Sequence, residues 1–179
     1  MKETTLKRPL VKTSNKTQAI AFAALIFALA IVLAVVESML PPLPIPVPGV
    51  KFGLSNIAVM YALFFLGGKQ AYAITALKAA FVFVTRGAIA GALSLSGGLL
   101  SITVMLILFF ILKEKISYTG ISILGAVFHN IGQFLVISII YMGTNLLAYL
   151  PVLLLSGVIA GLVTSTLLRF VLPALNRLA

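Results

Sequence analysis

Long apolar runs alternate with short polar, glycine-rich or proline-rich breaks along most of this chain. A helix needs about 20 mainly apolar residues to cross about 30 Å of hydrocarbon at about 1.5 Å per residue. Six runs are candidates for such helices. The second, of about 13 residues, is short for a span and is expected to tilt little or to rest partly on protein. The six runs cover residues 19–36, 54–66, 71–93, 99–112, 118–142 and 146–170.

Helix-breaking residues separate these runs. Prolines recur through residues 41–48, directly after the first run. Proline lacks the amide donor and clashes with the preceding helical turn, so we expect a stiff, extended loop there. The remaining breaks are expected at Gly67-Gly68, at Ser94 to Gly98, at Lys113-Glu114-Lys115 and at Gly143.

The composition requires a lipid environment. Hydrophobic residues make up 61% of the 179 residues, charged residues only 9%, and the mean hydropathy is +1.21. A soluble core of this size cannot bury so much apolar surface. The sequence therefore predicts an all-α integral membrane bundle of six transmembrane helices, with a basic tail at residues 1–18 and one helical domain at residues 19–179.

The basic residues predict the orientation of the bundle. With the N-terminus inside, the tail, Lys69, Lys113, Lys115, Arg169 and Arg177 place ten basic residues on the cytoplasmic side. The outer side receives Lys51 and Arg86. Under the positive-inside rule this bias predicts cytoplasmic N- and C-termini in a bacterial cytoplasmic membrane. It also explains the net charge of +10 without a nucleic-acid partner.

Few residues in the chain suit catalysis or metal binding. Cysteine and aspartate are absent, and the acids are Glu3, Glu37 and Glu114. A carboxylate pair for magnesium or for acid and base catalysis would have to come from residues far apart in sequence. We therefore expect no enzyme activity, no catalytic residue, no metal site and no cofactor.

Lys78 is the most unusual residue of the third run, because a cation near the membrane midplane is costly unless it is paired or faces water. Its side chain could extend toward the interface, or it could contact an anion or a carboxylate in a cavity. Glu37 could pair with Lys51, Lys78 or Arg86.

His129, Asn130 and Gln133 lie near the middle of the fifth run. The four-residue spacing places His129 and Gln133 on one helix face. These side chains could bind a ligand, or they could form hydrogen bonds between helices.

The first run contains small residues at four-residue spacing, which allow close helix packing against a partner helix or within the chain. They are Ala19, Ala23, Ala24, Ala28, Ala30 and Ala34. The chain has no GxxxxGK[ST] loop, so ATP-driven work by that route needs a partner.

Several segments together resemble a known family. They are Val36-Glu37-Ser38, PGVKFGLSN at 48–56, Arg86 with Gly91, Ser94 and Gly97-Gly98, and FHNIGQ at 128–133. They look like the Gx transporter family, whose members are often labelled heptaprenyl diphosphate synthase component I. That family is similar in size and helix count to the substrate-binding S components of energy-coupling-factor transporters.

The resemblance implies a membrane subunit that captures a small molecule from outside for uptake driven by separate ATPase subunits. It also implies that the alanines of the first run contact a transmembrane coupling subunit. The synthase label fits poorly, because prenyl synthases of the usual kind hold magnesium and diphosphate with Asp-rich motifs, and this chain has no Asp.

We therefore expect a transport subunit for a small anionic molecule, such as a vitamin, a flavin, or an isoprenoid or quinone precursor. The expected substrate-binding residues are Lys51, Asn56, Lys78, Arg86, His129, Asn130 and Gln133. The alternative is an accessory membrane subunit of prenyl diphosphate or quinone synthesis, or of a flavin-dependent electron-export system.

Overall fold

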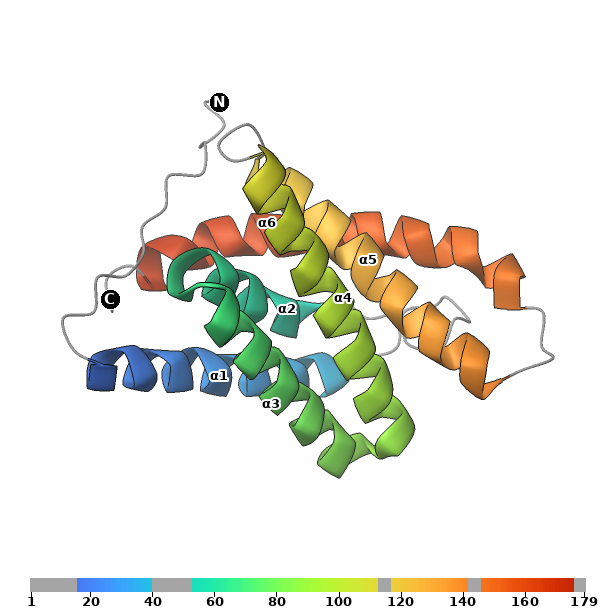
Figure 1. The fold of residues 1–179 in the computed structure, drawn as a ribbon, viewed down its shortest axis with the longest axis horizontal. Coiled ribbons are helices and arrows are strands. Elements are labelled where there is room, and N and C mark those ends of the chain that lie inside the picture. Colours follow the sequence, from blue (N-terminus) through green and yellow to red (C-terminus); the bar gives the residue numbers. More distant parts are fainter. Residues whose placement is uncertain (1–15, 40–52, 113–116, 142–145, 176–179) are drawn as a thin grey trace.

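The protein folds as a helical bundle in the computed structural model, which describes residues 16–39, 53–112, 117–141 and 146–175 (Figure 1). Within these ranges there is no strand, which confirms the predicted all-α class. A π-helical turn, Ala62–Leu66, extends α2, and a 3-10 turn, Leu146–Tyr149, precedes α6. The helices are α1 (Lys16–Met39), α2 (Leu54–Tyr61), α3 (Gly68–Arg86), α4 (Ala88–Leu112), α5 (Tyr118–Ile140) and α6 (Leu150–Leu175).

Four helical segments of the described chain are long and apolar enough to cross a membrane. They are Thr17–Met39, Ala88–Leu112, Tyr118–Ile140 and Leu147–Phe170. The chain is therefore a multi-pass membrane protein. The predicted spans at α2 and α3 are not among these four segments. The apolar helix Leu54–Leu66 is too short, and α3 carries three charged residues, Lys69, Lys78 and Arg86.

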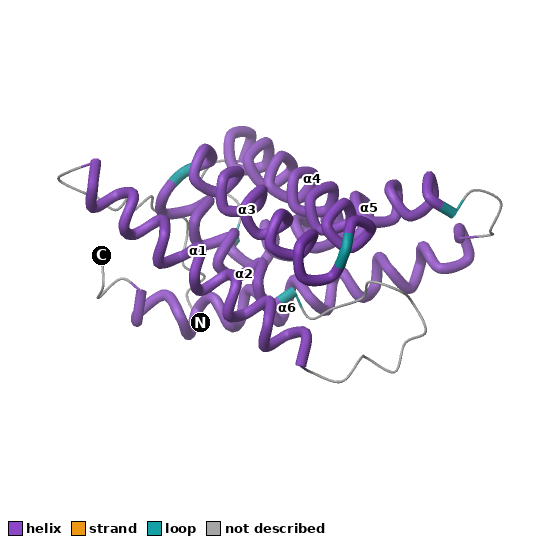
Figure 2. The backbone as a smooth tube through the Cα atoms, turned by 90° about the horizontal axis from the view of Figure 1, so that it is seen from below, coloured by secondary structure: helices purple, strands orange, loops and turns teal. Residues whose placement is uncertain are grey.

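The short second helix is enclosed by the other helices. It contacts α1, α3 and α6, and it lies in the middle of the bundle in two perpendicular views (Figures 1 and 2). Every residue from Ile57 to Phe65 is buried. The Tyr61 ring stacks on Phe65 with centroids 4.5 Å apart, and Phe64 meets Tyr118 edge to face at 5.2 Å. The prediction that this helix rests on protein is confirmed.

The boundary between the third and fourth helices differs from the prediction. We expected a helix to residue 93, a break at Ser94 to Gly98 and a new helix from residue 99. Instead α3 ends at Arg86, Gly87 has a φ of 91°, and α4 begins at Ala88. A positive φ is costly for residues with a Cβ, so Gly87 allows the turn that ends α3. Gly97 and Gly98 lie inside α4.

Glycines inside the helices bring the backbones of neighbouring helices together. A Cβ added at Gly97 of α4 would lie 2.8 Å from the carbonyl oxygen of His129 on α5. One added at Gly132 of α5 would lie 2.8 Å from the Ser96 oxygen, and one at Gly157 of α6 would lie 2.9 Å from the Val127 Cα. Small residues at such contacts permit close helix packing in membranes.

The two ends of the described chain lie on the same side of the bundle. The first turn of α1 and the last turn of α6 both lie at the left of Figure 1. An even number of crossings would give this arrangement. The assignment of that side to the cytoplasm remains a prediction from the positions of the basic residues.

Substitution of Gly132 tests the importance of this packing. We expect Gly132→Ala to lower the free energy of unfolding by about 1–3 kcal/mol, because its methyl group would meet backbone atoms of α4. Gly68→Ala is the matched control, because its methyl group would meet only the flexible Leu106 side chain, at 3.2 Å. Unfolding in detergent measures both. Equal stability of the two variants would contradict the close contact between α4 and α5.

Candidate functional site

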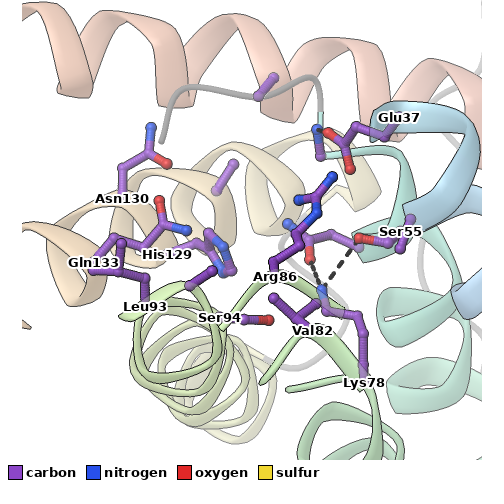
Figure 3. A pocket seen from close by; sticks show the side chains of 16 residues that line it. Glu37, Ser55, Lys78, Val82, Arg86, Leu93, Ser94, His129, Asn130 and Gln133 are labelled. Carbon is purple, nitrogen blue, oxygen red and sulfur yellow. Dashed lines mark hydrogen bonds between the residues drawn. The ribbon is translucent and has the colours of Figure 1, made fainter. Parts of the chain in front are cut away.

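A cavity of about 130 Å³ lies between the helices and collects most polar side chains that the sequence singled out. All six helices contribute to its lining, and Figure 3 shows two facing groups of polar side chains. Glu37, Lys78 and Arg86 lie on one side, and His129 and Gln133 lie on the other. Ser94 of α4 lies between the two groups.

The geometry of Lys78 excludes one of the alternatives that the sequence left open. Lys78 lies in the middle of α3 and is only 4% exposed, so it does not extend to the membrane surface. Its ammonium donates hydrogen bonds to the side-chain amide oxygen of Asn56 at 2.8 Å and to the Ser55 hydroxyl at 3.2 Å. Both acceptors belong to the first turn of α2. Lys78 therefore links α3 to the buried helix and brings a positive charge to the cavity.

Glu37 places a negative charge in the same cavity. It lies near the end of α1, is 9% exposed, and its carboxylate accepts a hydrogen bond from the backbone amide of Gly53. The charges of Lys78 and Arg86 both act favourably on it. Sequence reasoning treated Glu37 only as a possible ion-pair partner and not as a site residue. Its signal was available, because it is the only acid between Glu3 and Glu114 and directly follows the first apolar run.

Arg86 is the last residue of α3 and lines the cavity near its exposed edge. Unlike Lys78, it donates no hydrogen bond to any residue that the structure describes. A guanidinium group carries five N–H donors in a planar fork that matches carboxylate and phosphate groups. Arg86 is therefore the cation with donors available to a bound anion.

The three polar residues of α5 divide between two roles. The Asn130 amide donates to the Leu153 carbonyl at 2.8 Å and to the Ser156 hydroxyl at 3.1 Å, so it fastens α5 to α6. His129 has a buried Nδ1 atom with no hydrogen-bond partner in the described part of the chain. Gln133, one turn further along α5, also lines the cavity. The interhelical role fits Asn130, while His129 and Gln133 face the cavity.

Six of the seven predicted substrate-binding residues line this single cavity, and the seventh, Lys51, lies outside the described residues. The sequence did not identify Ser55 or Ser94 as site residues, because isolated serines are common in membrane helices. Among the described residues, no three His, Cys, Asp or Glu side chains gather closely enough to hold a metal ion.

The alanines of α1 do not share one surface. Ala30 is fully buried in the core and Ala34 lines the cavity, so these two pack inside the bundle. Ala24 and Ala28 are exposed, and Ala19 and Ala23 are half-buried. Contact with a partner helix remains a prediction for the exposed pair.

A double-mutant cycle tests the coupling of the two buried charges. Lys78→Met should cost about 1–3 kcal/mol of unfolding free energy, because the Ser55 and Asn56 oxygens lose their donor and Glu37 loses a balancing charge. Adding Glu37→Gln should recover part of this loss. Denaturation of all four proteins in detergent measures the coupling energy. Additive effects would show that the two charges do not interact.

Comparison with known proteins gives one result that covers most of the chain. A family model described as heptaprenyl diphosphate synthase component I matches residues 26–171. This span includes every residue that lines the cavity. No curated protein and no solved structure matches the chain. The resemblance seen in the sequence motifs is confirmed, and the chain belongs to the heptaprenyl diphosphate synthase component I family.

Proposed function

We propose that this protein is a membrane transport subunit that binds a small anionic molecule in the cavity. One observation carries the proposal: Lys78 and Arg86 both line a cavity within a membrane bundle, and Arg86 has donors to spare. Burying a cation such as Lys78 in a membrane is costly, so a bundle that keeps it beside a second cation at the edge of a cavity needs a compensating function. Binding of an anion supplies it.

The position of the cavity supports entry from the outer side. Glu37 lies near the end of α1, Gly53 precedes α2, and Arg86 ends α3, so the cavity lies toward the end of the bundle opposite the first turn of α1. Under the predicted orientation, that end faces outside. Lys51 lies two residues before Gly53 in sequence, and we retain it as a candidate ligand contact.

The contacts suggest how the candidate residues divide their work. Arg86, His129 and Gln133 are the best candidates for direct contact with the ligand. Lys78 and Asn56 bond to each other and supply charge and rigidity, and Asn130 holds α5 against α6. Preorganised polar groups lower the cost of ordering a binding site.

By similarity to S components, we further propose that separate ATPase subunits drive uptake and that a transmembrane coupling subunit connects them to this protein. The sequence contains no phosphate-binding loop of its own. The exposed Ala24 and Ala28 give α1 a surface of small residues on which a coupling helix would pack. A vitamin, a flavin, or an isoprenoid or quinone precursor remains the proposed range of cargo.

The family description favours a second candidate, an accessory membrane subunit of a prenyl diphosphate synthase. In that case the polar cavity would serve assembly with a catalytic partner, and no cargo would accumulate. Affinity purification from native membranes followed by mass spectrometry separates the two functions. Recovery of a coupling subunit with ATPases supports transport, and recovery of a soluble synthase or a flavin protein supports the accessory role.

Substitution of Arg86 tests the transport proposal. We expect Arg86→Gln to lower cargo uptake, and the amount of cargo retained on the purified protein, by about tenfold or more, because a charge-assisted hydrogen bond is lost. Lys69→Gln is the matched control, because it removes an exposed cation at the other end of α3. Uptake by cells and mass spectrometry of extracts provide the readout. Unchanged uptake and retention in Arg86→Gln would refute the proposal.

A further inference from the structure

We infer that the cavity selects a monocarboxylate: a ligand that carries one negative charge and whose enclosed part is no larger than about a benzene ring. The inference rests on the proposed binding function and names the chemical class of the cargo. Two features support it, which are the charges and open donors of the cavity, and its size.

Among the described residues, the charged side chains that line the cavity leave room for one negative charge. With Lys78, Arg86 and Glu37 counted as ionised and His129 as neutral, the lining holds two positive charges and one negative charge. The sum over the described lining residues is therefore +1. A monoanion neutralises the cavity, whereas a phosphate dianion leaves an excess negative charge in a poorly solvated site. Glu37 is the residue that disfavours the second charge.

The available hydrogen-bond donors also suit a carboxylate. Lys78 commits two of its three donors to Ser55 and Asn56, so most of the open cationic donors on this side of the cavity belong to Arg86. One guanidinium fork pairs with one carboxylate through two parallel hydrogen bonds. A diphosphate of the kind that prenyl synthases handle usually needs several cations or a metal ion.

The size and the apolar lining of the cavity limit the body of the ligand. A cavity of about 150 Å³ in another protein binds benzene, and the cavity here measures about 130 Å³. Small and aliphatic side chains complete its walls. They are Ala34, Val82, Ala90, Leu93, Ala126 and Ala160. A ring or a short aliphatic chain would fit against them, and bulkier parts of a ligand would remain outside.

Three probes with the same ring test the inference. Benzoate is the monoanion, benzamide is its neutral counterpart, and phenyl phosphate carries nearly two negative charges at neutral pH. Isothermal titration of the full chain in detergent is expected to give at least about tenfold tighter binding of benzoate than of either analogue. Phenyl phosphate binding as tightly as benzoate, or benzamide binding as tightly, would overturn the monocarboxylate inference, as would failure of benzoate to bind.

Two variants test which residues cause the preference for a monocarboxylate. Glu37→Gln keeps an oxygen that can accept from Gly53 but raises the cavity charge to +2, so the preference for benzoate over phenyl phosphate should fall by about tenfold. Arg86→Gln should weaken benzoate about tenfold and leave benzamide unchanged. An unaltered preference in Glu37→Gln would overturn the charge argument.

The outcomes also separate this inference from the broader proposal. If phenyl phosphate binds more tightly than benzoate, and Arg86→Gln weakens it, the cavity binds anions but is not selective for monocarboxylates. If none of the probes binds and Arg86→Gln leaves cellular uptake unchanged, the transport proposal fails together with the inference.

Discussion

The buried ammonium group of Lys78 constrains the rest of this structure. A lysine in the middle of a membrane helix needs oxygen acceptors and a balancing charge. The first turn of α2 provides both acceptors, and Glu37 provides the charge. To reach Lys78, α2 must lie inside the bundle, where every residue from Ile57 to Phe65 is buried. The short, enclosed helix and the polar cavity are thus two consequences of one buried cation.

The same arrangement explains why the cavity is polar on two sides only. Glycine contacts hold α4, α5 and α6 close together, and these contacts fix His129 and Gln133 opposite the charged residues. Asn130 adds hydrogen bonds to α6, so the wall formed by α5 is held on both sides. Arg86 is the exception, because none of its donors is committed to a described residue. A charged cavity in which one cation keeps its hydrogen-bond donors uncommitted to any described residue is suited to recognition of an anion.

Much of this organisation could be predicted from the sequence, because charges and amides inside apolar runs are rare and therefore informative. Asn56, Lys78, Arg86, His129 and Gln133 all line the cavity as expected. The ends of α3 and α4 could not be predicted, because glycine serves equally in turns and at close helix contacts. Only the folded chain shows that Gly87, with its positive φ, turns the backbone, while Gly97 packs against α5. The role of Asn130 was open for the same reason, since it depends on the position of α6.

The most direct test of the central claim is native mass spectrometry of the protein purified gently from its own membranes. Our account predicts a population that carries one small molecule of negative charge, which is lost from Arg86→Gln and retained in Lys69→Gln. Protein that carries no added mass under conditions that preserve bound lipid, with Arg86→Gln indistinguishable from the parent chain, would contradict the claim that this cavity binds an anion.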